Sequence, residues 1–170
     1  MSLSFLPTLL CDALTEVTPA LLQQRGIKLL MLDFDNTIVP YTTSVPTPEM
    51  ETWLRAMAQG SVQLCVVSNS RRDRVKVFCE KYGLPCITHS RKPFPKGIRQ
   101  CLAQYGMQPR EAAIVGDQIF TDTLGGNCAG LTTVLVRPIN NHNFWLKARH
   151  VLEQPFIILA KNRRISHEKS

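Results

Sequence analysis

Strand-like and helix-like stretches alternate along the middle of the chain, and this alternation limits the possible folds more than any other feature. The strand-like stretches are short and mostly apolar, and each helix-like stretch ends at a glycine. Such alternation predicts βαβ units, and therefore a three-layer α/β fold with a mostly parallel central sheet and helices on both faces. We expect strands at Ile27–Leu32, Val62–Val67, Cys86–Thr88, Ala112–Val115 and Thr132–Val136, and helices at Thr47–Gln59, Arg72–Tyr82, Lys96–Tyr105 and Thr121–Ala129.

The length of the chain sets the number of domains. With 170 residues it is long enough for one domain with a full core and too short for two ordinary domains. Hydrophobic residues make up 44% and charged residues 19%, which is typical of a soluble globular protein. We therefore expect residues 1–170 to form a single domain, with its core at about 27–136.

The cysteines and the N-terminus bear on localisation. The six cysteines are scattered and form no C-x-x-C pair, which favours core positions in a reducing compartment. No apolar stretch approaches the roughly 18 residues expected of a membrane-spanning helix. Pro7 and Asp12 interrupt the apolar N-terminus, so no signal peptide is predicted. These features predict a protein of the cytoplasm, or of an organelle matrix or stroma.

Polar side chains gather where the predicted strands end. In chain order they are Asp33, Asp35, Ser68, Asn69, Lys92, Asp117 and Asp122. The carboxyl ends of parallel strands meet at one edge of a sheet, and this edge is where such folds bind ligands. We therefore expect these residues to form one site.

The acidic residues of this group indicate metal-assisted phosphate chemistry. Asp33, Asp35 and Asp117 would repel one another unless a cation neutralised them, and Mg²⁺ prefers carboxylate oxygens together with water and a substrate phosphate. A carboxylate can attack phosphorus and form an aspartyl-phosphate. A second carboxylate two residues further on could protonate the leaving oxygen and later deprotonate water.

Simpler interpretations exist for each residue taken alone. A calcium-binding EF-hand loop starting at Asp33 would need glycine at Ile38 and glutamate at Ser44, so that interpretation fails. The later acids and the serine could be helix caps, and the lysine could be a surface residue. Four such coincidences in register are improbable. The arginines that follow Ser68 are interpreted as a solvated helix start, with binding of an anionic substrate as the alternative: Arg71, Arg72 and Arg74.

The order of these motifs strongly resembles the haloacid dehalogenase (HAD) superfamily, whose fold is a three-layer Rossmann-like one. Asp33-x-Asp35-x-Thr37 matches the first motif of that superfamily, and Gly116-Asp117 with Asp122 matches the fourth. The resemblance implies that Asp33 is the nucleophile and Asp35 the general acid/base. It also implies a Mg²⁺ ion held by the Asp33 and Asp117 side chains and the Asp35 backbone carbonyl, with Thr37 and Asp122 in support.

The second and third motifs supply groups that hold phosphate. Ser68 matches the phosphate-binding hydroxyl of the superfamily, and Asn69 stands next to it. Lys92-Pro93 matches the motif whose lysine contacts the phosphoryl group and the nucleophile. Lys96 is near enough to compete for this role, but the lysine of the superfamily is usually followed by proline, which favours Lys92.

A narrower resemblance concerns the absence of a cap domain. The segments Thr37–Val62 and Ser68–Lys92 are too short to form the cap that covers the site in many HAD phosphatases. The sequence resembles the YqeG subfamily of capless class III HAD phosphatases, which is similar to phosphatidylglycerophosphate phosphatases. The resemblance lies in Gly26–Lys28, Asp35–Pro40, Val67–Ser70, Gly116–Asp122 and Leu124–Gly130. It implies hydrolysis of a lipid phosphomonoester, because an open site suits a bulky substrate.

The C-terminal fifth of the chain is strongly basic. The formal net charge is +7, and a net +5 of it comes from Arg137 onward. The segment at about 143–170 contains Phe144-Trp145 and an apolar stretch, Phe156–Ala160, that leads into Lys161, Arg163 and Arg164. Such a segment could lie on an anionic membrane, or it could pack on the sheet like any terminal helix.

Three functions remain open from the sequence. The first is a phosphatidylglycerophosphate phosphatase at a membrane surface, and the second is a phosphatase of soluble nucleotides or sugar phosphates. The third is a ribosome- or RNA-associated phosphate-binding module that uses the basic end. Signatures of RNA-binding modules are absent, so a nucleic-acid partner is not expected. The sequence predicts no oligomeric state.

Overall fold

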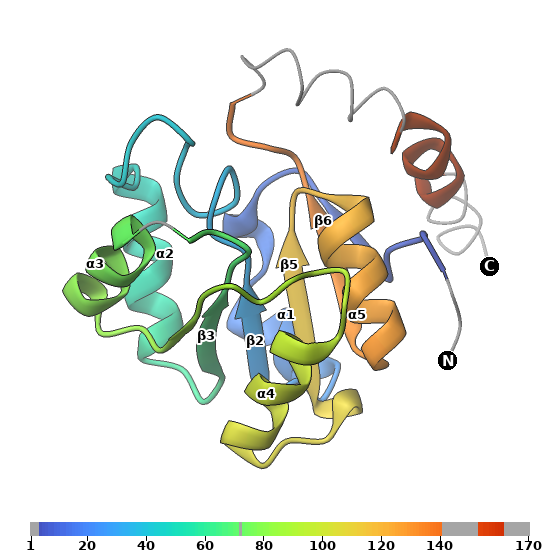
Figure 1. The fold of residues 1–170 in the computed structure, drawn as a ribbon, viewed down its shortest axis with the longest axis horizontal. Helices are drawn as coiled ribbons and strands as arrows, with labels where there is room; N and C mark the ends of the chain where they lie inside the picture. Colours follow the sequence, from blue (N-terminus) through green and yellow to red (C-terminus); the bar gives the residue numbers. More distant parts are fainter. Residues whose placement is uncertain (1–3, 72, 141–152, 162–170) are drawn as a thin grey trace.

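The structure is a computed structural model that describes residues 4–71, 73–140 and 153–161. Its centre is a six-stranded, all-parallel sheet with the strand order β1-β6-β5-β2-β3-β4 (Figure 1). The strands are β1 (Leu9–Cys11), β2 (Leu29–Leu32), β3 (Gln63–Val67), β4 (Cys86–Ile87), β5 (Ala112–Gly116) and β6 (Thr132–Val136). From β2 the chain first builds outward through β3 and β4, and then continues on the other side with β5. The strand order therefore reverses between β2 and β5, and this is where such sheets bind ligands.

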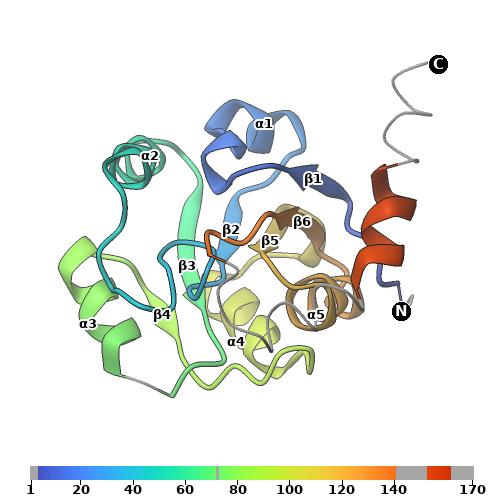
Figure 2. The same ribbon diagram turned by 90° about the horizontal axis from the view of Figure 1, so that it is seen from above.

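Helices cover both faces of the sheet, so the fold has three layers (Figure 2). One face is covered by α1 (Pro19–Gln24), α2 (Pro48–Ala58), α3 (Asp73–Tyr82) and the 3₁₀ turn η1 (Leu14–Glu16), and the other by α4 (Lys96–Tyr105) and α5 (Leu124–Ala129). The 3₁₀ turn η2 (Pro109–Glu111) precedes β5, and the π-helical turn η3 (Ile119–Thr123) follows it. The predicted α/β class, with helices on both faces, is confirmed.

The central strand β2 shows why the sheet needs both layers. Leu30 and Leu32 pack in the core beneath α2 and α3, whereas Leu29 and Met31 pack with α4. Side chains alternate between the two faces of a strand, and all four residues are fully buried. A nearly continuous apolar run is the sequence pattern of such a two-sided strand.

Local sequence signals fix the start of α2. The hydroxyl of Thr47 accepts a hydrogen bond from the Met50 backbone N–H at 3.2 Å, and Pro48 occupies the first turn. On the buried side of this helix, the indole N–H of Trp53 donates to the Val17 carbonyl oxygen at 2.9 Å. These contacts fix α2 and the η1 region together on one face of the sheet.

Four elements differ from the expected ones. The edge strand β1 and helix α1 were not expected, because the short strand is only half-buried and lacks a long apolar run. The expected helix at Thr121–Ala129 is divided into η3 and α5. The third strand ends at Ile87, one residue earlier than expected.

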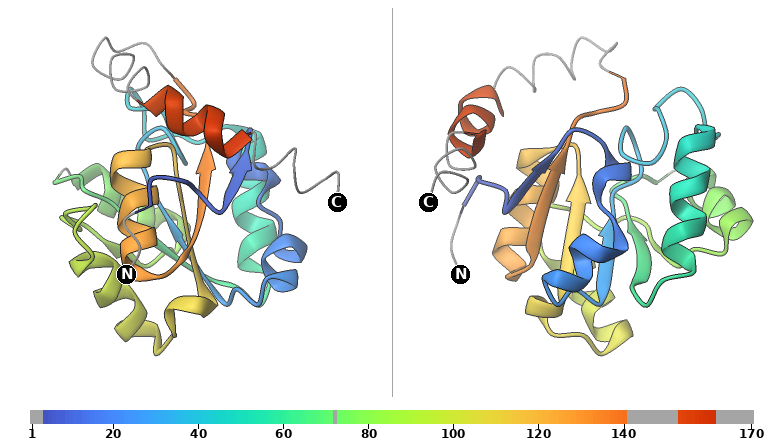
Figure 3. Two further views of the ribbon diagram at one scale, coloured as in Figure 1. Left: turned by 90° about the vertical axis from the view of Figure 1, so that its right-hand side faces the viewer. Right: turned by 180° about the vertical axis from the view of Figure 1, so that it is seen from behind.

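The segments between the strands leave the carboxyl edge of the sheet without a cap domain in the described part of the chain. Between β2 and β3 lie a loop and α2, and between β3 and β4 lies α3. A further helical segment, residues 153–161, lies at this edge (Figure 3). Among the described residues, none of the helices is both long and apolar enough to span a bilayer. Most of the basic segment predicted to contact a membrane, including Phe144-Trp145 and Arg163-Arg164, lies outside the described residues.

Candidate active site

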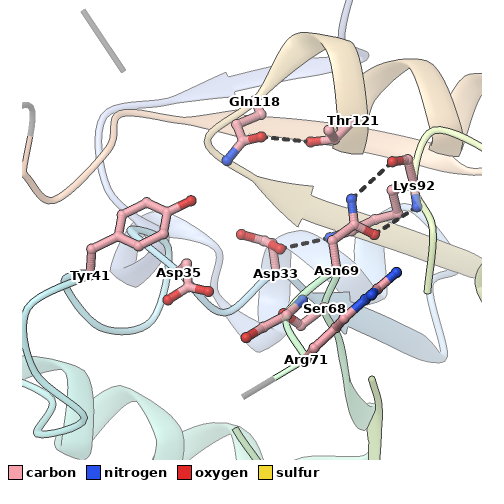
Figure 4. Close-up of a pocket in the computed structure, with 10 residues that line it drawn as sticks. Asp33, Asp35, Tyr41, Ser68, Asn69, Arg71, Lys92, Gln118 and Thr121 are labelled. Atoms are coloured by element: carbon pink, nitrogen blue, oxygen red, sulfur yellow. Dashed lines mark hydrogen bonds and ion pairs between the residues drawn. The ribbon is translucent and has the colours of Figure 1, made fainter. Parts of the chain in front are cut away.

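A pocket of about 460 Å³ lies at the carboxyl ends of β2, β3 and β5 (Figure 4). Its lining residues are Asp33, Asp35, Tyr41, Ser68, Asn69, Ser70, Arg71, Lys92, Gln118 and Thr121. The list includes all five residues predicted to act on the substrate, which are Asp33, Asp35, Ser68, Asn69 and Lys92. The two remaining predicted acids lie next to the pocket: Asp117 precedes Gln118, and Asp122 pairs with Lys92. The structure therefore brings the sequence-predicted residues together at one place.

Lys92 connects the predicted nucleophile to a second acid. Its Nζ lies 2.7 Å from Asp33 Oδ1 and 2.6 Å from Asp122 Oδ1. The three residues are almost inaccessible to solvent, with exposures of 5%, 6% and 2% for Lys92, Asp33 and Asp122. Lys96, by contrast, is exposed at the start of α4. Of the two candidate lysines, Lys92 is therefore the one that contacts Asp33.

The charges of this group depend on one another. Burial opposes the ammonium form of Lys92, but Asp122 and Asp33 outweigh it and raise the pKa of the lysine. Burial raises the pKa of Asp122 to about 6, although Lys92 lowers it and Asp33 adds to the rise. Lys92 is thus held as a cation, while Asp122 loses its proton less readily than an ordinary aspartate.

Three buried carboxylates form a candidate metal site. Asp33, Asp117 and Asp122 each offer a carboxylate oxygen, and these oxygens lie within 4.8 Å of one another. Oxygen donors of this kind fit Mg²⁺, and a single Lys92 ammonium cannot balance three carboxylates. The predicted set was the side chains of Asp33 and Asp117 together with the backbone carbonyl of Asp35, which this side-chain cluster does not test. The structure adds Asp122 to the cluster, and the Asp35 side chain is not part of it.

The side chain of Asp35 is held by an arginine from α3. Arg74 Nη2 lies 2.7 Å from Asp35 Oδ1, and the same guanidinium donates to the backbone carbonyls of Tyr41 at 2.6 Å and Pro40 at 3.2 Å. The Arg74 guanidinium also lies over the Phe34 ring, 5.2 Å from its centroid. The interpretation of this arginine as part of a solvated helix start is wrong. Arg74 fixes the predicted acid/base together with the turn behind it.

A tight turn follows the nucleophile and sets the direction of the chain. Asn36 has a φ of 62°, in the left-handed region that asparagine tolerates better than most residues. Its backbone N–H donates to the Val39 carbonyl at 2.7 Å, and its side chain donates to the Asn140 carbonyl at 2.9 Å. Thr37, which was predicted to support the site, is buried, with its hydroxyl 3.5 Å from Asp33 Oδ2. This is at the long limit for a hydrogen bond.

Asn69 fixes the segment that carries Lys92. Its side-chain oxygen accepts hydrogen bonds from the Lys92 backbone N–H at 2.7 Å and the Ser90 hydroxyl at 2.8 Å, and its amide donates to the Lys92 carbonyl at 2.9 Å. The Ser68 hydroxyl accepts from the Ser70 backbone N–H at 3.0 Å. Ser68 and Asn69 both line the pocket, as a phosphate-binding role requires. Their contacts with a substrate phosphate stay predictions. The structure adds a positioning role for Asn69.

Sequence reasoning missed several lining residues. Tyr41 carries no motif signal, and Thr121 lies in the Gly116–Asp122 run but received no role. Gln118 belongs to the Gly116–Asp122 run that was recognised as a motif, but it received no role. Its side-chain oxygen accepts from the Thr121 hydroxyl at 3.0 Å, which holds this part of the wall together.

Comparisons with known proteins agree with this geometry. Residues 89–150 match the family model Hydrolase_like, described as HAD-hydrolase-like. The chain is 34% identical over 135 residues to "Probable phosphatase YqeG" of Bacillus subtilis, a match covering 79% of this chain and 78% of that protein. It is 32% identical over 127 residues to a mitochondrial phosphatidylglycerophosphatase of Saccharomyces cerevisiae, a match covering 66% of this chain and 68% of that protein. A phosphatidylglycerophosphate phosphatase of Arabidopsis thaliana is 26% identical, and the match covers 40% of that longer protein.

Solved structures share the fold at low sequence identity. An uncharacterized protein from Listeria monocytogenes has a TM-score of 0.56 at 17% identity, over 69% of this chain and 84% of that one. The cobalt-bound deoxy-D-mannose-octulosonate 8-phosphate phosphatase of Haemophilus influenzae has a TM-score of 0.52 at 12% identity, over 66% and 69%.

The fold and the carboxylate-lined pocket define a HAD-type hydrolase. Within that class, the chain belongs to the family of phosphatases that includes YqeG and the phosphatidylglycerophosphatases. The protein is thus an enzyme, and the non-enzymatic alternative is not supported.

Proposed function

We propose that the protein is a Mg²⁺-dependent phosphomonoester hydrolase that works through a phosphorylated Asp33. The observation that carries this proposal is the buried Asp33 carboxylate at the pocket wall, 2.7 Å from the Lys92 ammonium and within reach of the Asp117 and Asp122 carboxylates. When bound by Asp33, Asp117 and Asp122, Mg²⁺ would reduce the repulsion between the nucleophile and the phosphate.

The proposed reaction has two steps. Asp33 attacks phosphorus, the bond to the leaving oxygen breaks, and Asp35 protonates that oxygen. Asp35 then takes a proton from water, which hydrolyses the aspartyl-phosphate and releases phosphate. Lys92 and Ser68 hold the phosphoryl oxygens in both steps. Arg74 holds the Asp35 carboxyl group in position for both proton transfers.

The mechanism is tested by Asp33→Asn, with Asp12→Asn as the control because Asp12 is exposed and pairs only with the exposed Arg137 among the described residues. Asp33→Asn should lower kcat for an artificial phosphate ester by at least about a thousandfold, as expected for the loss of a nucleophile. Mass spectrometry of acid-quenched wild-type enzyme should find a phosphoryl group on Asp33. Chelation of Mg²⁺ should stop turnover. Turnover by Asp33→Asn at the wild-type rate would refute the mechanism.

We further propose that the substrate is phosphatidylglycerophosphate at a membrane surface. Relatives named for that activity support this, and so does a site without a cap domain among the described residues. The head group carries a phosphodiester besides the terminal phosphate. Arg71 lines the pocket, is exposed, and has no ion pair with any described residue, so it is available for this second anion.

The substrate is tested with a matched panel of phosphatidylglycerophosphate in vesicles, nucleotides and sugar phosphates. We expect kcat/KM to be highest for the lipid. Arg71→Ala should lower kcat/KM for the lipid by up to about fivefold, the range for one exposed ion pair, and should leave a small artificial ester unaffected. The control is Arg99→Ala, an exposed arginine on α4. Efficient turnover of nucleotides or sugar phosphates without lipid activity would support the soluble alternative instead.

A further inference from the structure

The carboxylate of Glu153 is buried against the loop that carries the metal-binding acids. Glu153 is 2% exposed, and its Oε1 accepts hydrogen bonds from the backbone N–H groups of Ile119 at 3.0 Å and Phe120 at 3.4 Å. Ile119 and Phe120 are the first two residues of η3. The N–H groups of a first helical turn have no partner inside the helix, so Glu153 acts as a cap from a distant part of the chain.

The capped turn lies between two residues of the candidate metal site. Asp117 precedes it and Asp122 belongs to it. Asp122 is itself tied to the start of the turn, because its backbone N–H donates to the Gln118 carbonyl at 3.0 Å and its Oδ2 accepts from the Gln118 N–H at 3.3 Å. A shift of this turn would therefore displace the carboxylates relative to Asp33.

An aromatic cluster fixes the helical segment 153–161 on the same turn. The ring of Phe156 lies 5.0 Å from that of Phe5 and 6.3 Å from that of Phe120, and the rings of Phe5 and Phe120 are 5.8 Å apart. Aromatic contacts at such distances add to the stabilisation from burial. The cluster brings together the N-terminal segment, η3 and segment 153–161, so the carboxylate of Glu153 is delivered by a packed element.

A buried carboxylate needs this degree of compensation. Moving a charge out of water is costly unless hydrogen bonds offset the cost, and bonds from N–H groups to a charged oxygen are the strong kind. Glutamate at this position is not required for packing alone, because an apolar residue would fill the space at a lower desolvation cost. Among the described residues, the hydrogen bonds to the turn distinguish Glu153 from an apolar side chain.

We propose that Glu153 is a positioning residue that holds η3, and with it Asp117 and Asp122, in the geometry that binds the metal ion. The proposal rests on the proposed metal site. Segment 153–161 would then fix the turn that carries the metal-binding acids, although this segment is distant in sequence from the motif residues.

The test uses the full chain and compares Glu153→Ala with Glu153→Gln, which loses the charge but keeps an oxygen acceptor. The control is Glu80→Ala, an exposed glutamate on α3. Calorimetry measures Mg²⁺ binding, and NMR measures amide hydrogen exchange at Ile119 and Phe120. Glu153→Ala should weaken Mg²⁺ binding by about tenfold, the lower end of the range for groups behind metal ligands. Exchange at both amides should accelerate, and Glu153→Gln should restore most of both properties.

Several results would overturn the proposal. It is wrong if Glu153→Ala binds Mg²⁺ as the wild type does, if exchange at the two amides is unchanged, or if exchange accelerates equally at Ile114 in β5, which would indicate a general loss of stability. If Glu153→Ala does not fold, Glu153→Leu fills the space without an acceptor and has the same expected outcomes. A wild type that binds no Mg²⁺ would refute the metal site itself. Exchange at the two amides would still test whether Glu153 holds the turn.

Discussion

Lys92 is the residue on which the charge balance of the site depends. Its ammonium contacts the Asp33 and Asp122 carboxylates in a place almost free of solvent. Removing one partner of a buried ion pair leaves an uncompensated charge and typically costs about 3–5 kcal/mol. A second cation in the same cluster would offset part of that cost.

This balance predicts how Lys92→Met should behave. Without Mg²⁺, the variant should lose about 3–5 kcal/mol of unfolding free energy in urea titrations, because its carboxylates repel one another. Saturating Mg²⁺ should recover part of this loss, since the ion binds the folded state only. Lys96→Met, at an exposed position, should unfold like the wild type. A Lys92→Met protein with wild-type stability and activity would contradict this role for the lysine.

Motif residues could be predicted from the sequence because each of them follows a strand. The parallel arrangement then brings Asp33, Ser68 and Asp117 to one edge without any knowledge of distances. The contact of Arg74 with Asp35 could not be predicted in this way. It depends on where α3 lies relative to the turn after β2, and this is set by packing of the helix on the sheet.

At the scale of elements, the close contact between α5 and the sheet depends on glycine. A Cβ added at Gly126 would lie 2.5 Å from Thr133 Cγ2 on β6, and it would also collide with Ile114 on β5. Both neighbours are fully buried, so they have little room to move. The same closeness appears at Gly116, where a side chain would collide with the Asp122 carboxylate.

Gly126→Ala should therefore destabilise the protein although alanine favours helices. Overpacking of a filled core typically costs about 1–3 kcal/mol, which outweighs the gain of up to about 1 kcal/mol in helix propensity. Urea unfolding measures the difference. Gln100→Ala, at an exposed position of α4, should stay within about 0.5 kcal/mol of the wild type. A Gly126→Ala variant that is more stable than the wild type would show that α5 can move away from the sheet.

The bounds of elements with a strong hydrophobic pattern were predicted within a few residues. Elements without such a pattern were not predicted. The strands β2, β3, β5 and β6 have buried apolar runs. The edge strand β1 has three half-buried residues, and its pairing with β6 is a long-range contact that local sequence does not encode. The expected helix is divided into η3 and α5 where the Asp122 side chain accepts a hydrogen bond from the Gln118 backbone N–H. This contact belongs to the site, and helix propensity does not predict it.

At the scale of the whole molecule, exposed apolar residues concentrate in segments that follow the carboxyl ends of strands. Val45, Phe94 and Ile139 lie in such segments, and Ile158 and Leu159 lie on segment 153–161 at the same edge (Figure 3). Ile158 is 53% exposed and Leu159 54%, although the other side of their helix is packed through Glu153 and Phe156. A helix with apolar residues on its packed and its outer face suggests a second partner for the outer face.

An anionic bilayer suits this surface, because the apolar pair is followed by Lys161, Arg163 and Arg164 in the sequence. Insertion of an apolar side chain into a membrane gains about 1.5–3 kcal/mol when burial is complete. Each basic residue near an anionic surface adds about 1 kcal/mol. If the substrate is a lipid, such a surface would bring the pocket to the head groups without a membrane-spanning helix.

The prediction is that Ile158→Ser combined with Leu159→Ser weakens binding to vesicles that contain anionic lipid by more than about tenfold, because two inserting side chains are lost. Hydrolysis of a small artificial ester should not change, since neither side chain lines the pocket. Val77→Ser is the matched control, because Val77 is 63% exposed but lies on α3. Co-sedimentation with vesicles measures binding, and turnover of the ester in solution measures the site. Equal loss of vesicle binding in the control would point to a non-specific effect of surface polarity, and unchanged binding in the double variant would exclude segment 153–161 as the membrane contact.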